Sequence, residues 1–322
     1  MHQLRIDAVG FEGRSNAYLI EGDGPTSLID TGVATAETEQ QLRSSLSQHG
    51  VEIRDIDRIL LTHFHYDHAG LAGLIQQESG AEVYCHPDEE PYVTAGSNGI
   101  AGQFAKERKD LQRWEIPSSA LEELLDFLQS TASLAGDPPA VNTIDDGDRL
   151  QLGSSTATAC HLPGHTAGHL GFDLGDGAVV AGDAMLPVYT ANVGGADLRL
   201  EHPLVSYFES LDRILALEPD VVWPGHRDPI DDAVGRANEI SEHHCHRAGR
   251  ILDVLRDVGP TTPWQVATEL FGDLRGIHIL HGTGETYAHL DYLRLHGHVT
   301  MDDGRFDVQD GGDLKSSFPH FE

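Results

Sequence analysis

The amino-acid sequence predicts an α/β fold in which a layered sandwich is followed by a small helical domain. Two observations indicate the sandwich. Short apolar runs typical of buried strands alternate with amphipathic helical segments over residues 1–86, and strand-like segments dominate residues 148–225. A third observation sets the end of the chain apart, because the pattern after His226 changes to three helical segments and a short hairpin, as in a winged-helix module.

The elements of the first half can be assigned from periodicity and from the residues that end helices. Apolar or alternating segments predict five strands, over residues 4–9, 16–22, 27–32, 57–62 and 81–86. Two segments with helical periodicity each end at a glycine, over residues 35–50 and 68–80. Residues 87–140 begin as a loop and continue with two amphipathic helical segments, so we interpret them as a helical insertion.

The second half resumes with strands and ends with helices. Four strands are predicted over residues 148–153, 156–162, 169–175 and 178–183. A helix over 202–219 and a strand over 220–225 complete the sandwich. The last helices are predicted over residues 235–258, 262–272 and 284–299, the second with Thr262 as its N-cap. We therefore expect one domain over residues 1–232, containing the 87–140 insertion, and a winged-helix-like domain over 233–322, a length that suits two domains.

The composition is strongly acidic, with 21 Lys and Arg against 52 Asp and Glu, a net charge of −31. The acids are spread evenly, which favours a halophile-like surface suited to a salt-rich cytoplasm over specific repulsion of anionic partners. No apolar run is long enough for a transmembrane helix, and the N-terminus lacks a secretory pattern, so we expect a cytoplasmic protein that does not bind membranes. The three cysteines are far apart, as expected for buried, reduced thiols.

The strongest chemical signal is the segment LLTHFHYDHAGL over residues 60–71. It places His63, His65, Asp67 and His68 directly after an apolar strand, where a turn can direct several side chains into one cleft. Imidazoles and carboxylates suit zinc, and also iron or manganese. A solvated histidine-rich loop is the alternative, and the aspartate among histidines after a buried strand argues against it.

Three further segments place a metal-binding residue type just after a strand. They are CHLPGHTAGH with His165, VVAGDAM with Asp183 and VVWPGHRDP with His226. In each segment a glycine precedes that residue and lets the backbone turn sharply at the edge of the sheet. Each tripeptide alone is weak evidence, but the order of all three after the first motif is highly specific.

Together these four motifs resemble the metallo-β-lactamase superfamily over roughly residues 4–230. The resemblance implies an αββα sandwich as the catalytic domain and a centre of two divalent cations, expected to be zinc, with iron or manganese as alternatives. It also implies that a hydroxide between the cations is the nucleophile. The implied ligands are His63, His65 and His165 for one metal, Asp67, His68 and His226 for the other, and Asp183 as the bridge.

The same resemblance assigns supporting roles. Asp67 is expected to orient the nucleophile and to move its proton, so Asp67 and Asp183 are the expected catalytic residues. Asp30, in LIDTG, matches an acid that supports the ligand histidines, and His169 is interpreted as a neighbour of the site rather than a ligand. His243, His244 and His246, and likewise His278 and His281, are expected on solvated or interdomain faces.

Two branches of the superfamily share these features. The metal motifs resemble glyoxalase II and related thioesterases, whereas the C-terminal segments resemble the winged-helix tail of the beta-lactamase-like protein 2 group, some of which are endoribonucleases. From residue 236 onward there are eight basic and fourteen acidic residues, and no basic stripe, which does not favour nucleic acid as a partner.

We therefore predict hydrolysis of a small-molecule ester or thioester. An endoribonuclease or phosphodiesterase activity is the alternative, and a mononuclear iron sulfur dioxygenase a minor one. The C-terminal domain is expected to shape access to the site or to mediate interactions, including formation of a homodimer.

Overall fold

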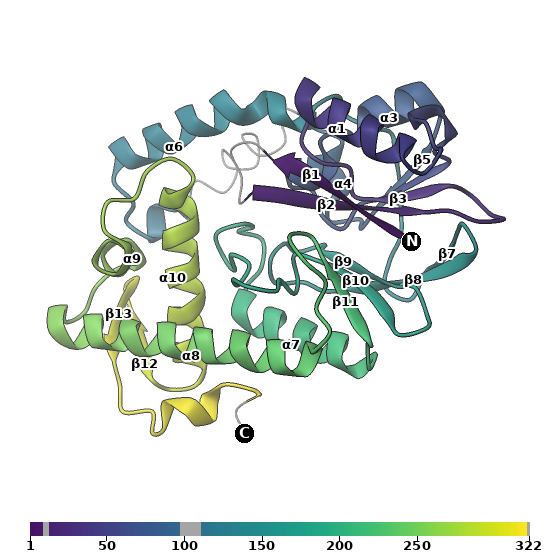
Figure 1. The fold of residues 1–322 in the computed structure, drawn as a ribbon. Coiled ribbons are helices and arrows are strands. Elements are labelled where there is room, and N and C mark those ends of the chain that lie inside the picture. Colours follow the sequence, from purple (N-terminus) through teal and green to yellow (C-terminus); the bar gives the residue numbers. More distant parts are fainter. Residues whose placement is uncertain (9–12, 97–110, 321–322) are drawn as a thin grey trace.

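The computed structural model describes residues 1–8, 13–96 and 111–320, so part of the predicted insertion, residues 97–110, lies outside the described residues. Two mixed β-sheets pack face to face, and helices cover their outer faces (Figure 1). This is the α/β sandwich that the sequence predicts.

The first sheet contains six strands in sequence order. They are β1 (His2–Ala8), β2 (Gly13–Ile20), β3 (Ser27–Ile29), β4 (Arg58–Leu60), β5 (Glu82–Cys85) and β6 (Val141–Thr143). The first three are antiparallel, and β3 to β6 run parallel. Strand β6 was not predicted, because its short sequence lies next to the insertion and two of its three residues are exposed.

The second sheet has the order β11-β10-β9-β8-β7. Its strands are β7 (Arg149–Leu152), β8 (Ser155–His161), β9 (Leu170–Asp173), β10 (Ala178–Gly182) and β11 (Val221–Pro224). Strands β10 and β11 are parallel, so the residues that follow them emerge at the same edge of the sheet.

Helices pack on both outer faces of the sandwich. On the first sheet lie α1 (Ala36–Ser47) and α3 (Ala72–Ser79), preceded by the short α2 (Tyr66–Ala69). On the second sheet lies α7 (Pro203–Ala216). Neighbouring residues of the central strands point to opposite cores: Leu28 packs under the helices, whereas Ile29 packs between the sheets. Because both faces are buried, these strands are continuously apolar in sequence.

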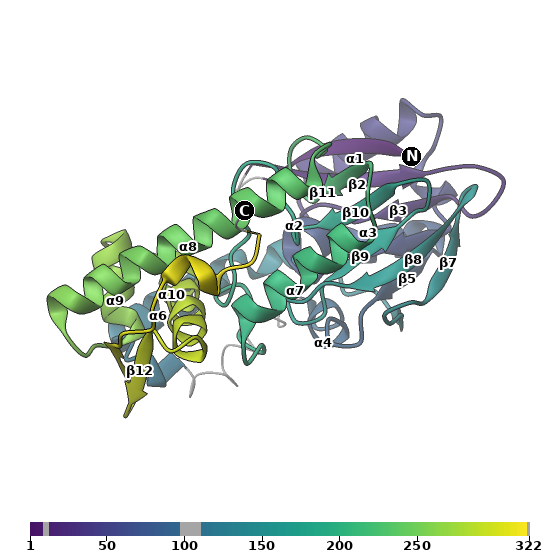
Figure 2. The same ribbon diagram turned by 90° about the horizontal axis from the view of Figure 1, so that it is seen from below.

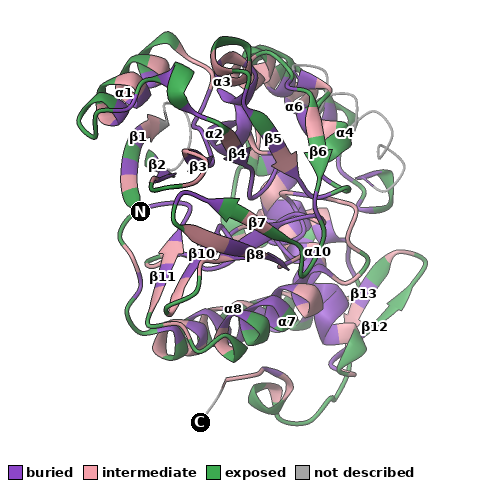
Figure 3. Ribbon diagram, turned by 90° about the vertical axis from the view of Figure 1, so that its right-hand side faces the viewer, coloured by how far each residue is buried: buried purple, intermediate pink, exposed green. Residues whose placement is uncertain are grey.

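The C-terminal region contains α8 (Ala233–Val258), α9 (Pro263–Phe271), α10 (His278–Leu295) and the hairpin of β12 (Val299–Asp302) and β13 (Arg305–Val308). Figure 2 shows α8 running from the sandwich out to α9, α10 and the hairpin. Thr262 caps α9 as predicted, since its side chain accepts the N–H of Gln265. Residues of α7, α8 and α10 share one buried core, so this region packs directly onto the sandwich. Figure 3 shows that exposed residues gather instead on the outer side of α1 and on the hairpin.

Helix α10 begins six residues before the predicted start at Gly284. The sequence obscures this start because Gly282 and Gly284 are poor helix formers. The structure explains Gly284: a Cβ atom there would overlap the carbonyl oxygen of Gly194, so glycine permits α10 to approach the loop that follows Asp183.

The insertion packs against the C-terminal region. It contains the short α4 (Glu90–Val93), in a segment predicted as a loop, and α6 (Ser118–Thr131). Apolar residues of α6, among them Leu124 and Leu128, share a buried core with Ile279 and Leu280 of α10. Two segments far apart in sequence therefore form one helical layer beside the sandwich.

Two further expectations can be compared with the structure. All three cysteines are buried and unpaired, as expected. Among the described residues, no helix combines the length and apolar character needed to cross a bilayer.

Candidate metal centre

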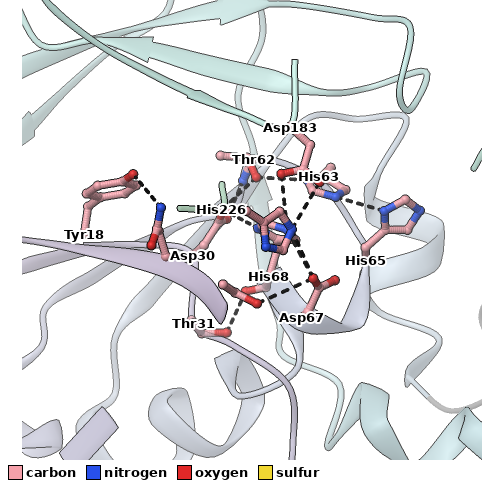
Figure 4. Close-up of polar contacts among 12 residues, drawn as sticks. Tyr18, Asp30, Thr31, Thr62, His63, His65, Asp67, His68, Asp183 and His226 are labelled. Atoms are coloured by element: carbon pink, nitrogen blue, oxygen red, sulfur yellow. Dashed lines mark hydrogen bonds and ion pairs between the residues drawn. The ribbon is translucent and has the colours of Figure 1, made fainter. Parts of the chain in front are cut away.

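The seven residues singled out as metal ligands come together at one edge of the sandwich. Figure 4 labels all of them except His165. Four of them lie in the turn that follows β4 and in α2, so they are presented by the first sheet. The other three follow strands of the second sheet: His165 lies in the loop after β8, Asp183 directly after β10, and His226 after β11.

Three imidazoles form the first group. His63 Nε2 lies 2.9 Å from His65 Nδ1, and His65 Nδ1 lies 3.0 Å from His165 Nε2. Three ring nitrogens therefore point toward one small volume, and all three residues are buried or half-buried. Such a convergence of nitrogen lone pairs is typical of a metal site.

The second group contains Asp67, His68 and His226. Asp67 Oδ2 lies 3.4 Å from His226 Nε2 and 3.6 Å from His68 Nε2. The carboxylate of Asp183 lies between the two groups: its oxygens are 3.7 Å from His165 Nε2, 3.6 Å from His68 Nε2 and 3.4 Å from His226 Nε2. The Asp183 carboxylate thus lies within 3.7 Å of an imidazole of each group.

The electrostatic environment suits cations. Burial, together with neighbouring histidines, lowers the pKa values of His63 and His65 well below the usual range, so these imidazoles stay neutral and keep a free lone pair. At His68 burial acts in the same direction, but Asp67, Asp183 and Asp30 outweigh it and raise the pKa to about 10. The negative field that favours a proton at His68 favours a metal cation equally.

Unpaired buried atoms also fit a metal. Within the described part of the chain, His68 Nε2 and Asp183 Oδ1 are buried and make no hydrogen bond. Leaving a buried polar atom without a partner costs about 1–3 kcal/mol, so such atoms call for a ligand. Both point into the centre of the cluster, and the donor set of five imidazoles and two carboxylates fits divalent cations.

Hydrogen bonds at the outer nitrogens orient the imidazoles. His165 Nδ1 donates to the carbonyl of Asn192 at 2.9 Å, and His226 Nδ1 donates to the carbonyl of Arg14 at 3.0 Å. His65 uses the opposite nitrogen, since its Nε2 donates to the carbonyl of Ala196 at 3.3 Å. In each case the remaining nitrogen faces the cluster with its lone pair available.

Asp30 lies beside two of the imidazoles, and its role as a supporting residue stays a prediction. Its carboxylate is buried and accepts the N–H of Thr62 at 2.8 Å, the hydroxyl of Thr62 at 2.8 Å and Nδ1–H of His68 at 2.9 Å. The Thr62 hydroxyl in turn lies 3.0 Å from His63 Nδ1. Asp30 has a positive φ of 60°, a conformation that Asp and Asn adopt more readily than most residues.

His169 lies beside the centre and does not point into it. Its Nε2 accepts the backbone N–H of Asp183 at 3.1 Å, and its ring stacks on His63 with 5.0 Å between centroids.

The close approach of the Asp183 carboxylate to the backbone of Gly225 explains the glycine at that position, because a Cβ atom there would overlap the carboxylate.

The histidines of α8 lie away from the seven residues. His246 is exposed and His243 half-buried, whereas His244 is fully buried and its ring contacts Tyr207 of α7 and His289 of α10. His244 is hydrogen-bonded to His289 of α10. Because His289 Nδ1 donates to the carbonyl of Glu285 at 2.7 Å, its Nε2 accepts from His244 Nδ1 at 3.0 Å. None of them belongs to a metal-binding group within the described residues.

Sequence reasoning missed several residues that contact this region. Asn192 and Ala196 contact the imidazoles only through their backbone carbonyls, and a backbone carbonyl leaves no residue-type pattern in the sequence. Glu89 is a fully buried acid whose carboxylate binds backbone N–H groups of two ligand-bearing turns. It lies in the segment PDEEPY, where it resembles any exposed loop acid.

Comparisons with known proteins agree with this geometry. The family model of the metallo-beta-lactamase superfamily matches residues 10–226. A probable metallo-hydrolase, YqjP of Bacillus subtilis, is 30% identical over 92% of this chain and 93% of its own length. A beta-lactamase-like protein 2 homolog of Drosophila melanogaster is 25% identical over 74% of this chain and 67% of its own. The crystal structure of TTHA1429, a metallo-beta-lactamase family protein from Thermus thermophilus, matches with a TM-score of 0.80 and 29% identity, covering 96% of this chain and 98% of the other.

Proposed function

The chain belongs to the metallo-β-lactamase superfamily and is a hydrolase of that family, and on this premise we propose that it cleaves a small-molecule ester or thioester with two divalent cations. The observation that carries the proposal is the position of Asp183 between two groups of three ligands. A shared carboxylate of this kind suits a pair of adjacent cations better than one cation.

The residues would divide as follows. His63, His65 and His165 would hold one cation, Asp67, His68 and His226 the other, and Asp183 both. Such a pair, when bound, supplies Lewis-acid polarisation of the scissile carbonyl and a water activated as the nucleophile. We propose zinc, and iron or manganese are the alternatives that metal analysis distinguishes.

Asp67 is the residue that we propose to orient the attacking water. Its Oδ2 lies 3.4 Å from His226 Nε2 and accepts a hydrogen bond from the hydroxyl of Ser15 at 3.5 Å, which holds the buried carboxylate in the cluster. A carboxylate in this position can accept the proton of the water and hold it until the leaving group takes it.

The surroundings of the site favour a small substrate. The loop after Asp183 contacts both the centre and α10: the Ala196 carbonyl binds His65, and the side chain of Asn192 donates to the carbonyl of His281 at 3.1 Å. The C-terminal region therefore contacts the loop that borders the centre. Its excess of acids over bases opposes a polyanion there, whereas it does not oppose a small ester or thioester.

A ribonuclease activity is the second candidate. It is favoured by the arrangement of the C-terminal region, in which three helices precede a two-stranded hairpin, as in the winged-helix tail that the sequence resembles. Parallel assays on thioesters, aryl esters and single-stranded RNA distinguish the two. Cleavage of RNA without ester or thioester turnover would establish the second candidate and refute the first.

The metal assignment is tested by elemental analysis of the wild type and three variants. We expect about two cations per chain in the wild type, and loss of both metal and hydrolysis in His63→Ala and Asp183→Ala. His243→Ala is the control, because this histidine is half-buried on α8 and outside the cluster. Equal metal loss in all three variants would refute the ligand assignment, and a single iron without hydrolysis would indicate the dioxygenase alternative.

A further inference from the structure

Glu89 is a fully buried acid, and both oxygens of its carboxylate accept hydrogen bonds from N–H groups. Its Oε2 accepts the backbone N–H of Phe64 at 2.8 Å, while its Oε1 accepts the backbone N–H of Gly168 at 2.8 Å and Nη2–H of Arg199 at 3.1 Å. It lies just before α4, outside the seven residues of the centre.

The two backbone donors belong to the turns that carry the first group of imidazoles. Phe64 lies between His63 and His65, and Gly168 follows His165 by three residues. These turns follow strands of different sheets, and one backbone hydrogen bond, from the N–H of Leu170 to the carbonyl of Thr62 at 2.7 Å, already links the chain beside them. One carboxylate therefore joins the two turns whose imidazole nitrogens, His65 Nδ1 and His165 Nε2, approach to 3.0 Å.

Asp197 and Arg199 extend the same connection. Asp197 is buried, accepts the backbone N–H of Ala167 at 2.8 Å and pairs with the Arg199 guanidinium at 2.9 and 3.0 Å. Its neighbour Ala196 provides the carbonyl that binds His65. Arg199 also lies over the ring of Tyr92, with 4.2 Å to the centroid.

Two buried carboxylates, of Glu89 and Asp197, pair here with a half-buried guanidinium, which is unfavourable as a purely stabilising device. Burial, together with the neighbouring Asp197, raises the pKa of Glu89 to about 7, although Arg199 and the N–H groups of Phe64 and Gly168 oppose the shift. Replacing buried ion pairs with apolar residues is often neutral or stabilising, so their presence calls for a reason other than stability. The hydrogen bonds from these carboxylates to the backbone of the two turns supply such a reason, because they fix where the turns lie.

We propose that Glu89, with Asp197 and Arg199, is a positioning cluster that sets the spacing of the His63–His65 turn and the His165–His169 turn for binding of the first metal. This inference rests on the proposed metal centre. Because Glu89 binds the backbone between His63 and His65 and next to His165, but no residue of α2 or of the loop after β11, we expect its loss to weaken binding of the first metal more than the second.

The test compares Glu89→Gln with Glu90→Gln, an exposed neighbour of the same size and charge. The amide of Glu89→Gln retains one acceptor oxygen and turns an NH₂ group toward N–H donors. Affinities for zinc are measured by chelator competition, the geometry of the sites by the absorption spectrum of the cobalt-substituted protein, and stability by thermal unfolding. Arg199→Lys is the second variant, should Glu89→Gln fail to fold.

We expect Glu89→Gln to bind one of two zinc ions roughly 10- to 100-fold more weakly and to change the cobalt spectrum, as supporting residues of metal ligands do. Glu90→Gln should match the wild type. A Glu89→Gln protein that is less stable but has both affinities and the spectrum of Glu90→Gln would show a merely structural role and overturn the proposal. A wild type that binds no metal would overturn the proposed centre itself, and the positioning role with it.

Discussion

Replacing Asp30 by asparagine changes the chemistry of one buried group and leaves its backbone unstrained. Asparagine adopts a positive φ as readily as aspartate, so the turn at φ 60° can be retained. The carboxylate serves three donors, two from Thr62 and one from His68. An amide offers one acceptor oxygen. If that oxygen stays with the Thr62 backbone N–H, the NH₂ group faces the Thr62 hydroxyl and His68 Nδ1, and in the flipped orientation it faces the Thr62 N–H instead.

The structure gives the size of the effect. Either His68 Nδ1–H loses its acceptor, which costs about 1–3 kcal/mol of stability for a buried donor, or the imidazole changes tautomer. In the second case the amide donates to Nδ1 and the proton moves to Nε2, the nitrogen that faces Asp67 and Asp183. A protonated Nε2 cannot bind a cation. We therefore expect Asp30→Asn to weaken metal binding roughly 10- to 100-fold.

The assay is chelator competition for zinc, with hydrolysis and thermal unfolding measured on the same preparations. The matched control is Asp176→Asn, because Asp176 is exposed and also has a positive φ, of 49°. If Asp30→Asn bound zinc as tightly as Asp176→Asn, the hydrogen bond from His68 would not control the tautomer, and this reasoning would be refuted.

Three further predictions test other parts of the molecule. Removing the metal with a chelator should abolish hydrolysis and lower the melting temperature, and zinc should restore both; full activity in metal-depleted protein would contradict the proposed centre. Gly225→Ala should lose metal, because its Cβ would overlap the Asp183 carboxylate. Its control is Gly249→Ala in α8, where the nearest atom to the added Cβ is 3.7 Å away, and this variant should be as stable as the wild type or more stable by up to about 1 kcal/mol. Burial, opposed by the Glu285 carbonyl, lowers the pKa of His289 to about 3, so between about pH 6.5 and 3 the unfolded imidazole binds a proton that the folded one does not. This contribution to stability is present above about pH 6.5 and is lost as the pH falls, at roughly 1.4 kcal/mol per pH unit. The midpoint of urea unfolding should therefore depend less on acid in His289→Gln, and an unchanged dependence would count against a neutral buried His289.

The sequence by itself determined the sandwich and the residues that meet at its edge. Polar side chains that follow buried strands emerge where the strands end, and the resemblance to the metallo-β-lactamase superfamily implied that His63, His165, Asp183 and His226 lie in one site. The structure brings these side chains together, and their role as ligands stays a prediction. The helical C-terminal region was also readable, because amphipathic periodicity is a local property of the chain.

Only the tertiary structure decided which distant surfaces meet. The packing of α6 against α10, and the early start of α10 against the Gly194 loop, depend on contacts between segments more than 80 residues apart. Glu89 and Arg199 are likewise separated by 110 residues and lie in charged segments that resemble exposed loops. Periodicity reports which face of an element is buried, but it does not report the partner. A buried acid whose purpose is to hold distant backbone groups therefore becomes visible only when the chain is folded.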